Sequence, residues 1–440
     1  MNHHTNTWPL NSVIHSTAKC LMVCLLSVLL TSTLNADDGA RGIALVGGSV
    51  VDINGGKPIR NAVVLIEGER IAAVGEADEV DIPADTEVID VAGKWLIPGM
   101  MNMHVHLGLV LPGKMAAELA DESDSALALR MAQSARDSLQ AGVTTIRLPG
   151  DSRHADLALM RSINKGESVG PRIFSAGESI IITGGHGSER GVEYNDGPYE
   201  LMKAARREIS AGATWIKILI SGGIATDGGD ISKALMTPEE INAVIDAAHR
   251  FGAKVTAHSG SPQATSIAVD AGIDCIEHGY FLDRPVLKKM QKAGTWLVPT
   301  IVVSQPATAD FFEKIGSPQW YLDRRDSVGK EHWKALETAI EEGVNIALGT
   351  DQLPSEPNDG TTAQAREAQY YVEAGMTNLQ ALRAATIEPA RLLGADRDTG
   401  SIEVGKYADI VALAANPEDD IKALRDIRLV MKGGHVYRNE

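Results

Sequence analysis

A chain of 440 residues, 44% of them hydrophobic, can bury a large core, and its length suits one large domain with a smaller accessory one. The composition excludes collagen, low-complexity disorder and a bundle of membrane helices. Acidic residues outnumber basic ones by 58 to 41, and the net charge of −17 argues against nucleic acid and anionic membrane surfaces as partners.

An apolar run near the N-terminus, Cys20–Leu30, is too short to span a bilayer but suits the h-region of a secretory signal. Ala36 precedes a plausible cleavage point. We therefore expect residues 1–36 to be a signal peptide and the mature protein to be exported, either to the periplasm or into the medium. The alternatives are an uncleaved anchor and a start codon assigned too early. Cleavage leaves Cys275 as the only cysteine, so no internal disulfide can form.

Short alternating apolar stretches, separated by Gly, Pro and Asp turns, fill the region after the apolar run as far as residue 97. This texture is typical of a small antiparallel β layer. The last part of the chain, from residue 396, repeats it. We expect residues 37–97 and 396–440 to form one composite β-sandwich domain from both termini.

Between these ends, apolar strands alternate with helical stretches, which predicts an α/β fold with a parallel sheet wrapped by helices. Eight strands are expected, at residues 95–106, 143–148, 172–176, 215–220, 254–258, 275–278, 296–302 and 345–350. Eight such units indicate a (β/α)8 TIM barrel over residues 98–395. The active site of a barrel lies where the C-terminal ends of its strands meet.

Metal-binding residue types occupy these strand ends. In a strand, His104 and His106 point to the same face and can grip one ion. The further candidates are Lys217, His258, His278 and Asp351. Each one alone can equally be a core residue, but six at one barrel mouth favour a metal site. Imidazole and oxygen ligands without cysteine suit Zn²⁺, ahead of Mn²⁺, Co²⁺ or Fe²⁺. An ammonium group repels a divalent ion, so Lys217 must be neutral or chemically altered to serve as a ligand.

Together these segments resemble the amidohydrolase superfamily. The motifs that carry the resemblance are Pro98-Gly-Met-Met-Asn-Met-His104-Val-His106, Gly142-Val-Thr-Thr, Gly212-Ala-Thr-Trp-Ile-Lys217, Ala257-His258, Ile276-Glu-His278-Gly and Gly349-Thr-Asp351. The lysine motif and Thr183-Gly-Gly-His186-Gly are similar to the branch related to imidazolonepropionase, with prolidase-like, Xaa-dipeptidase-like and ochratoxin-hydrolysing members. Asn102 departs from the family pattern, in which this position is usually Asp.

The resemblance implies a pair of divalent metal ions bridged by a carbamate that CO₂ forms on Lys217. It assigns His104, His106 and Asp351 to one ion, and His258 and His278 to the other. A bridging hydroxide then attacks the scissile carbonyl, and Asp351 takes its proton and passes it to the leaving amine. The implied partners are a small-molecule substrate and further copies of the chain, with an octamer as one candidate assembly.

Two other histidines lie in loops on the expected catalytic face, His186 after the third strand and His154 after the second. Both are candidates for substrate binding, and a hydrogen bond that orders the loop is the alternative for each. The remaining mature histidines, His249, His332 and His435, are expected to be solvated. Cys275 is out of phase with His278 and is expected to pack in the core.

The resemblance favours hydrolysis of an amide bond in N-acyl amino acids or dipeptide-like substrates, with aryl amides such as ochratoxin A as a further option. Dipeptidase relatives often carry a tyrosine shortly after the equivalent of His258, and none follows here. A cyclic amide, lactone or phosphotriester substrate is one alternative. A non-catalytic binding protein on the same scaffold is the other, although it would be expected to have lost metal ligands.

Overall fold

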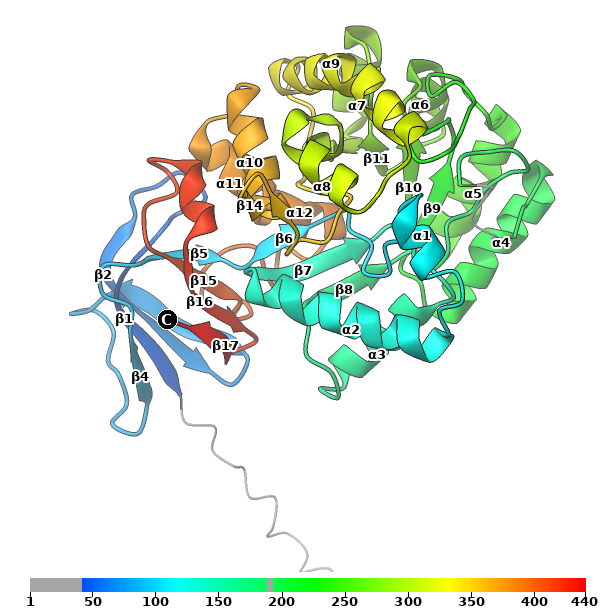
Figure 1. Cartoon of the computed structure of the whole chain (residues 1–440). Helices are drawn as coiled ribbons and strands as arrows, with labels where there is room; N and C mark the ends of the chain where they lie inside the picture. Colours follow the sequence, from blue (N-terminus) through cyan, green and yellow to red (C-terminus); the bar gives the residue numbers. More distant parts are fainter. Residues whose placement is uncertain (1–41, 188–192) are drawn as a thin grey trace, which may run out of the picture. The chain divides into compact units, whose positions relative to one another are not determined.

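The computed structural model describes residues 42–187 and 193–440, and this part of the chain has mixed α/β content, as expected (Figure 1). The predicted signal peptide lies outside the described residues. Within them, no helix is long and apolar enough to cross a membrane.

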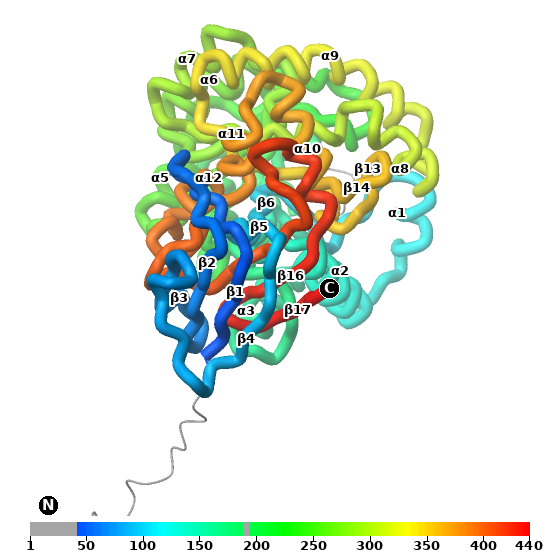
Figure 2. The backbone as a smooth tube through the Cα atoms, turned by 90° about the vertical axis from the view of Figure 1, so that its left-hand side faces the viewer, coloured from blue at the N-terminus to red at the C-terminus, as the bar shows by residue number. Residues whose placement is uncertain are grey.

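Strands from both ends of the chain come together in one eight-stranded sheet (Figure 2). Its order is β17-β16-β15-β5-β1-β2-β3, with β4 also paired to β1. Its members are β1 (Ile43–Val50), β2 (Ile59–Glu67), β3 (Arg70–Glu76), β4 (Glu87–Asp90), β5 (Trp95–Pro98), β15 (Ile410–Leu413), β16 (Ile427–Lys432) and β17 (His435–Asn439). The expected all-antiparallel layer is wrong in one respect, because β4 and β5 run parallel to β1. Because β2 pairs with one edge of β1, the chain must cross over before β4 and β5 can pair with the opposite edge of β1. The sandwich and its domain limits stay predictions.

The middle of the chain forms two parallel sheets. One has the order β6-β7-β8 and the other β12-β11-β10-β9. Their strands are β6 (Met100–Asn102), β7 (Val143–Leu148), β8 (Arg172–Ser175), β9 (Trp215–Leu219), β10 (Lys254–Ser259), β11 (Cys275–His278) and β12 (Trp296–Val298). A parallel bridge joins Ile180 to Ile218, and another joins Leu297 to Ile346. Residues 345–350, the expected eighth strand, also meet β6, since the Met103 amide donates to the Leu348 carbonyl at 2.7 Å.

Helices separate these strands and cover them (Figure 1). They are α1 (Lys114–Glu118), α2 (Asp124–Gln140), α3 (Ala155–Asn164), α4 (Gly197–Ala211), α5 (Pro238–Arg250), α6 (Pro262–Asp270), α7 (Arg284–Ala293), α8 (Ala309–Lys314), α9 (Gln319–Glu341), α10 (Ala363–Glu373), α11 (Asn378–Ala384) and α12 (Ile387–Leu393). Shorter elements are the 3₁₀ turns η2 (Ile301–Ser304), η3 (Pro306–Thr308) and η4 (Ile421–Arg425), and the hairpin β13 (Pro357–Asn358) and β14 (Thr361–Thr362).

Local sequence explains why such helices start where they do. The Thr237 side chain accepts from the Glu240 amide, the Glu240 side chain accepts from the Thr237 amide, and Pro238 opens α5 with no N–H to satisfy. The helix then buries one apolar stripe, formed by Ile241, Val244, Ile245, Ala247 and Ala248.

The expected first strand, residues 95–106, is divided at Gly99 between the terminal sheet and the parallel sheet. It ends at Asn102, so the two histidines lie just beyond the strand and not within it. The Asn102 side-chain oxygen accepts from the His104 amide at 3.1 Å and from the Thr350 amide at 3.2 Å. These bonds take the place of regular strand pairing and tie the two segments together.

The expected seventh strand, residues 296–302, ends early, at Val298. The two side-chain carboxyl oxygens of Glu367, on α10, accept from the amides of Ile301 and Val302 at 2.9 and 2.8 Å. Those two amides therefore cannot donate to a neighbouring strand, and the chain forms the 3₁₀ turn η2 instead of continuing the strand.

Glu367 makes the stability of the fold depend on pH. Burial raises its pKa to about 8 from the ordinary value of 4.5, so the folded protein keeps a proton that the unfolded chain releases. The contribution of this group to folding stability is complete below about pH 4.5 and is lost as the pH rises towards 8. Gln at this position stays neutral at every pH. As the pH rises across this range, the melting temperature of Glu367→Gln should therefore increase relative to that of the wild type.

Thermal unfolding of both proteins across that pH range measures this difference. Glu331→Gln, an exposed change on α9, is the matched control and should show no such trend. A difference in melting temperature between Glu367→Gln and wild type that is constant with pH would contradict the argument.

Candidate metal centre

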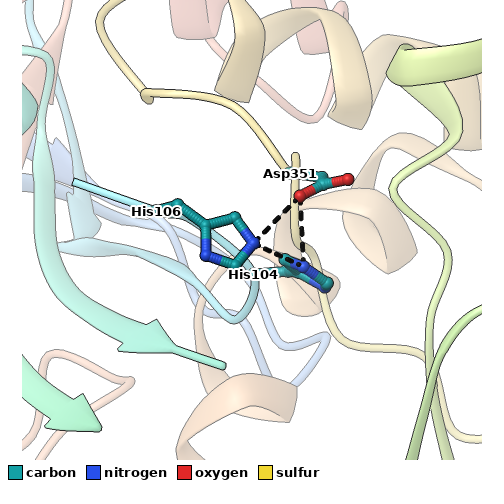
Figure 3. A group of neighbouring side chains, drawn as sticks. All are labelled: His104, His106 and Asp351. Carbon is teal, nitrogen blue, oxygen red and sulfur yellow. Dashed lines mark hydrogen bonds and ion pairs between the residues drawn. The ribbon is translucent and has the colours of Figure 1, made fainter. Parts of the chain in front are cut away.

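Three predicted ligands converge at the C-terminal side of the parallel strands (Figure 3). The Nε2 atoms of His104 and His106 lie 3.2 Å apart, and each lies 3.2 Å from Oδ1 of Asp351. The backbone fixes this grouping, because the amide of Asp351 donates to the His104 carbonyl at 2.7 Å. Asp351 has a left-handed backbone with φ of 54°, which aspartate tolerates better than most residues.

The second nitrogen of each imidazole already has a partner. His104 Nδ1 lies 2.7 Å from Oε2 of Glu277, and His106 Nδ1 lies 2.5 Å from the Gly150 carbonyl. Both partners are acceptors, so the proton of each neutral ring belongs on Nδ1 and Nε2 carries a lone pair. Two nitrogen lone pairs and a carboxylate oxygen thus face one another with no proton between them.

A cation resolves this repulsion, and the spacing suits one. Zinc held at 2.0–2.1 Å by tetrahedral ligands separates those ligands by about 3.3 Å, close to the observed distances. Burial alone would raise the pKa of Asp351, but positive charge and hydrogen bonds at the His104 and His106 ring nitrogens outweigh it and hold that pKa well below its ordinary value. A cation bound between bare Nε2 atoms supplies the same positive charge. The carboxylate is therefore ionised and ready to bind a metal.

Lys217, His258 and His278 line the same cavity but lie outside this compact group. The rings of His104 and His278 are 4.8 Å apart between centroids, and those of His278 and His258 are 4.5 Å apart. His258 Nε2 lies 3.0 Å from the Gly222 carbonyl, and His278 Nδ1 lies 2.7 Å from the Thr300 hydroxyl.

Lys217 is 4% exposed, and within residues 42–187 and 193–440 no hydrogen bond or ion pair to its ammonium is observed. Burial lowers its pKa to about 8, although Glu277 and Asp351 oppose the change. Burial likewise lowers the pKa of His258 to about 3 and that of His278 well below its ordinary value. Neutral imidazoles and an amine that loses its proton easily fit the chemistry of metal ligands.

The two predicted substrate-binding histidines occupy different places. His186 lines the cavity, is 8% exposed, and has its ring centroid 4.4 Å from that of His258. His154 does not line the cavity. Its Nε2 lies 2.6 Å from the buried carboxylate of Glu208, on α4. His186 therefore borders the cavity, whereas His154 is hydrogen-bonded to Glu208 and lies outside the cavity lining.

Sequence reasoning missed three buried residues behind the ligands. Glu277 hydrogen-bonds His104, and Arg147 pairs with Glu277. His332, expected to be solvated, is only 1% exposed, because its Nε2 reaches the carbonyls of His278 and Pro299 at 3.1 and 3.0 Å. Glu277 could have been identified from the sequence, because it lies within the Ile276-Glu-His278-Gly motif. Cys275 is buried, as predicted.

Comparison with known proteins identifies the family of this chain. Residues 95–437 match the amidohydrolase family, a span that includes every residue of the cavity. The chain belongs to that family. The match agrees with the resemblance of the sequence motifs and with the metal-binding residue types in the cavity.

The relatives of this amidohydrolase include an ochratoxinase and a Xaa-Pro dipeptidase. It is 30% identical to ochratoxinase of Aspergillus niger over 421 residues, which cover 87% of this chain and 84% of the relative. A crystal structure of a Xaa-Pro dipeptidase with bound methionine superposes with a TM-score of 0.82 at 32% identity, covering 90% of this chain and 100% of that one. The crystal structure of A. niger ochratoxinase gives 0.78 at 28% identity, covering 92% and 97%.

This amidohydrolase is therefore a metal-dependent hydrolase of carbon–nitrogen bonds that acts on a small-molecule substrate, and its fold is TIM-barrel-like. Relatives in this family generally use divalent metals, which agrees with the convergence of His104, His106 and Asp351.

The cavity of this amidohydrolase also has an apolar and aromatic lining, here called the roof, which comes from two segments. One is the loop that leads to α1, and the other runs from η2 to the start of α9. The segments touch where the Lys114 amide donates to the Gly316 carbonyl at 3.3 Å. The roof side chains that line the cavity are Leu109, Leu111, Val303, Phe312 and Tyr321.

Proposed function

We propose that this amidohydrolase holds two divalent ions, most simply Zn²⁺, and cleaves the amide bond of N-acyl amino acids or dipeptide-like substrates, including aryl amides such as ochratoxin A. The observation that carries the proposal is the convergence of three lone-pair donors in one cavity with a buried lysine and two further neutral histidines.

His104, His106 and Asp351 would hold one ion, and His258 and His278 the other. Lys217 would serve both as a carbamate, formed when its neutral amine adds to CO₂ and releases a proton. Its buried position and lowered pKa favour the neutral amine that this reaction needs. When bound, such ions lower the pKa of a water molecule and polarise the scissile carbonyl.

Asp351 has the proton-transfer role in this proposal. Its carboxylate is ionised and borders the cavity, so an Oδ atom can accept the proton of the attacking water. The same carboxyl group then delivers that proton to the amine nitrogen, which must be protonated to leave. His186, on the same cavity wall, is placed to hydrogen-bond the substrate.

The roof supports an apolar group on one side of the scissile bond. Leu109, Phe312 and Tyr321 offer a hydrophobic and aromatic surface, and among the described residues that line the cavity the only lysine or arginine is Lys217. A bulky or aromatic acyl group suits this surface better than a charged one. Two relatives, an ochratoxinase and a Xaa-Pro dipeptidase, support amide substrates of this kind.

We further propose that the two parallel sheets and residues 345–350 close into a (β/α)8 barrel. The bridges from Ile180 to Ile218 and from Leu297 to Ile346 support this closure. A β-sandwich from both termini, export after loss of residues 1–36, and assembly into a homo-oligomer complete the proposal.

Removal of the metal tests the function. Dialysis against a strong chelator should abolish hydrolysis of a panel of N-acyl amino acids and dipeptides, and Zn²⁺ with bicarbonate should restore it. Elemental analysis of the restored enzyme should find two ions per chain. A stripped enzyme that keeps its activity would refute metal dependence, and full activity with one ion per chain would refute the pair.

A further inference from the structure

Tyr280 lies at the cavity wall two residues after His278. Its ring stacks on that of His278, with 5.2 Å between centroids and 8° between planes. It also approaches His258 edge-on, at 6.1 Å. The phenol ring thus contacts two of the proposed metal ligands from one side.

Three neighbours fix the position of this ring. Besides the stacking on His278, the ring of His332 meets it edge-on at 4.9 Å and 78°. On another side lies Gly260, where a Cβ atom would be only 2.9 Å from Cδ2 of Tyr280. Gly260 therefore leaves the space that the ring needs, and the hydroxyl is held at one point.

The hydroxyl itself has no observed hydrogen bond to any residue in the described part of the chain. Tyr280 as a whole is 2% exposed, yet its oxygen is not among the fully buried polar atoms that lack a partner. The oxygen therefore keeps contact with solvent, and the cavity is where it does so. A tyrosine hydroxyl in such surroundings normally has a partner, so the cavity should supply it.

We infer that the Tyr280 hydroxyl donates a hydrogen bond to the scissile carbonyl oxygen of the substrate, an inference that rests on the proposed amide hydrolysis at this site. The contacts with His278 and His258 place the phenol beside the proposed metal ligands. A fixed neutral donor stabilises the oxygen more as it gains negative charge than it does in the bound substrate. The phenol keeps its proton throughout.

Tyr280→Phe tests this, because it removes one oxygen and retains the ring and its packing. Loss of one donor of this kind lowers kcat by roughly 100- to 1000-fold. We expect a fall of about that size with little change in KM, measured on any amide that the wild type cleaves. Inhibition by a phosphonate analogue of the same substrate should weaken by a similar factor. Zinc content and melting temperature should equal those of the wild type.

The matched control is Tyr407→Phe in the C-terminal part of the chain, which does not line the cavity and should behave as wild type. A kcat within twofold of the wild type, a rise in KM alone, or loss of zinc would each overturn the role of Tyr280. If the wild type cleaves no amide at all, the proposed function fails instead, so the two failures are distinguishable.

Discussion

Asp351→Asn is expected to abolish most of the activity, with kcat reduced by about 1000-fold or more. General acid–base catalysis contributes roughly 100- to 10,000-fold, and this variant loses both the proton carrier and the anionic member of the group formed with His104 and His106. An amide oxygen can still face the two Nε2 atoms, but it binds a metal more weakly and takes no proton. Steady-state kinetics and zinc content, measured on the same preparation, separate the two losses.

Asp326→Asn provides the control, since that aspartate is on α9, pairs with Arg325 and does not line the cavity. It should retain the activity of the wild type. If Asp351→Asn kept its zinc and lost less than about tenfold in kcat, then Asp351 would not be the proton carrier.

Arg147→Met is expected to lower the free energy of unfolding by about 3–5 kcal/mol, the usual effect of removing one partner of a buried ion pair. Arg147 and Glu277 are both fully buried, and the Arg147 Nε also donates to the Met103 carbonyl at 2.6 Å. Burial alone would raise the pKa of Glu277, whereas Arg147 and His104 lower it and keep the carboxylate charged. Without the arginine, this charge is left in the core without its ion-pair partner.

Urea denaturation, followed by tryptophan fluorescence, measures the change. Adding Glu277→Gln to Arg147→Met should recover part of the lost stability, since it removes the stranded charge. The exposed pair of Arg250 and Asp246, on α5, supplies the control, and Arg250→Met should leave the unfolding midpoint unchanged. Equal midpoints for Arg147→Met and wild type would contradict the role of the pair.

The order of elements was predictable because apolar runs and helical stretches are local properties of the sequence. The strands around Thr145, Ile216 and Val255 lie where expected for this reason. The seventh strand was overextended because the residue that shortens it, Glu367, is far away in the chain. No local pattern shows that the amides of Ile301 and Val302 have a side-chain partner.

The candidate site was predictable as a set of residue types but not as an arrangement. His104 and His106 were expected to share a strand face, and in fact they lie beyond the strand, where Asn102 takes over the pairing. His332 was expected in solvent because a histidine on a long helix gives no sign of its burial. Its neighbours, the carbonyls of His278 and Pro299, come from other elements.

The sequence by itself determined the family, the metal-binding residue types and their places at strand ends, because spacing along a strand or loop is written in the order of residues. The tertiary structure alone decided which ring nitrogen of His104 and of His106 carries a free lone pair. Only folding brings Glu277 to His104 and the Gly150 carbonyl to His106, and those partners leave both Nε2 lone pairs facing Asp351. It also decided that Tyr280 lines the cavity, with a hydroxyl that makes no hydrogen bond to any residue among 42–187 and 193–440.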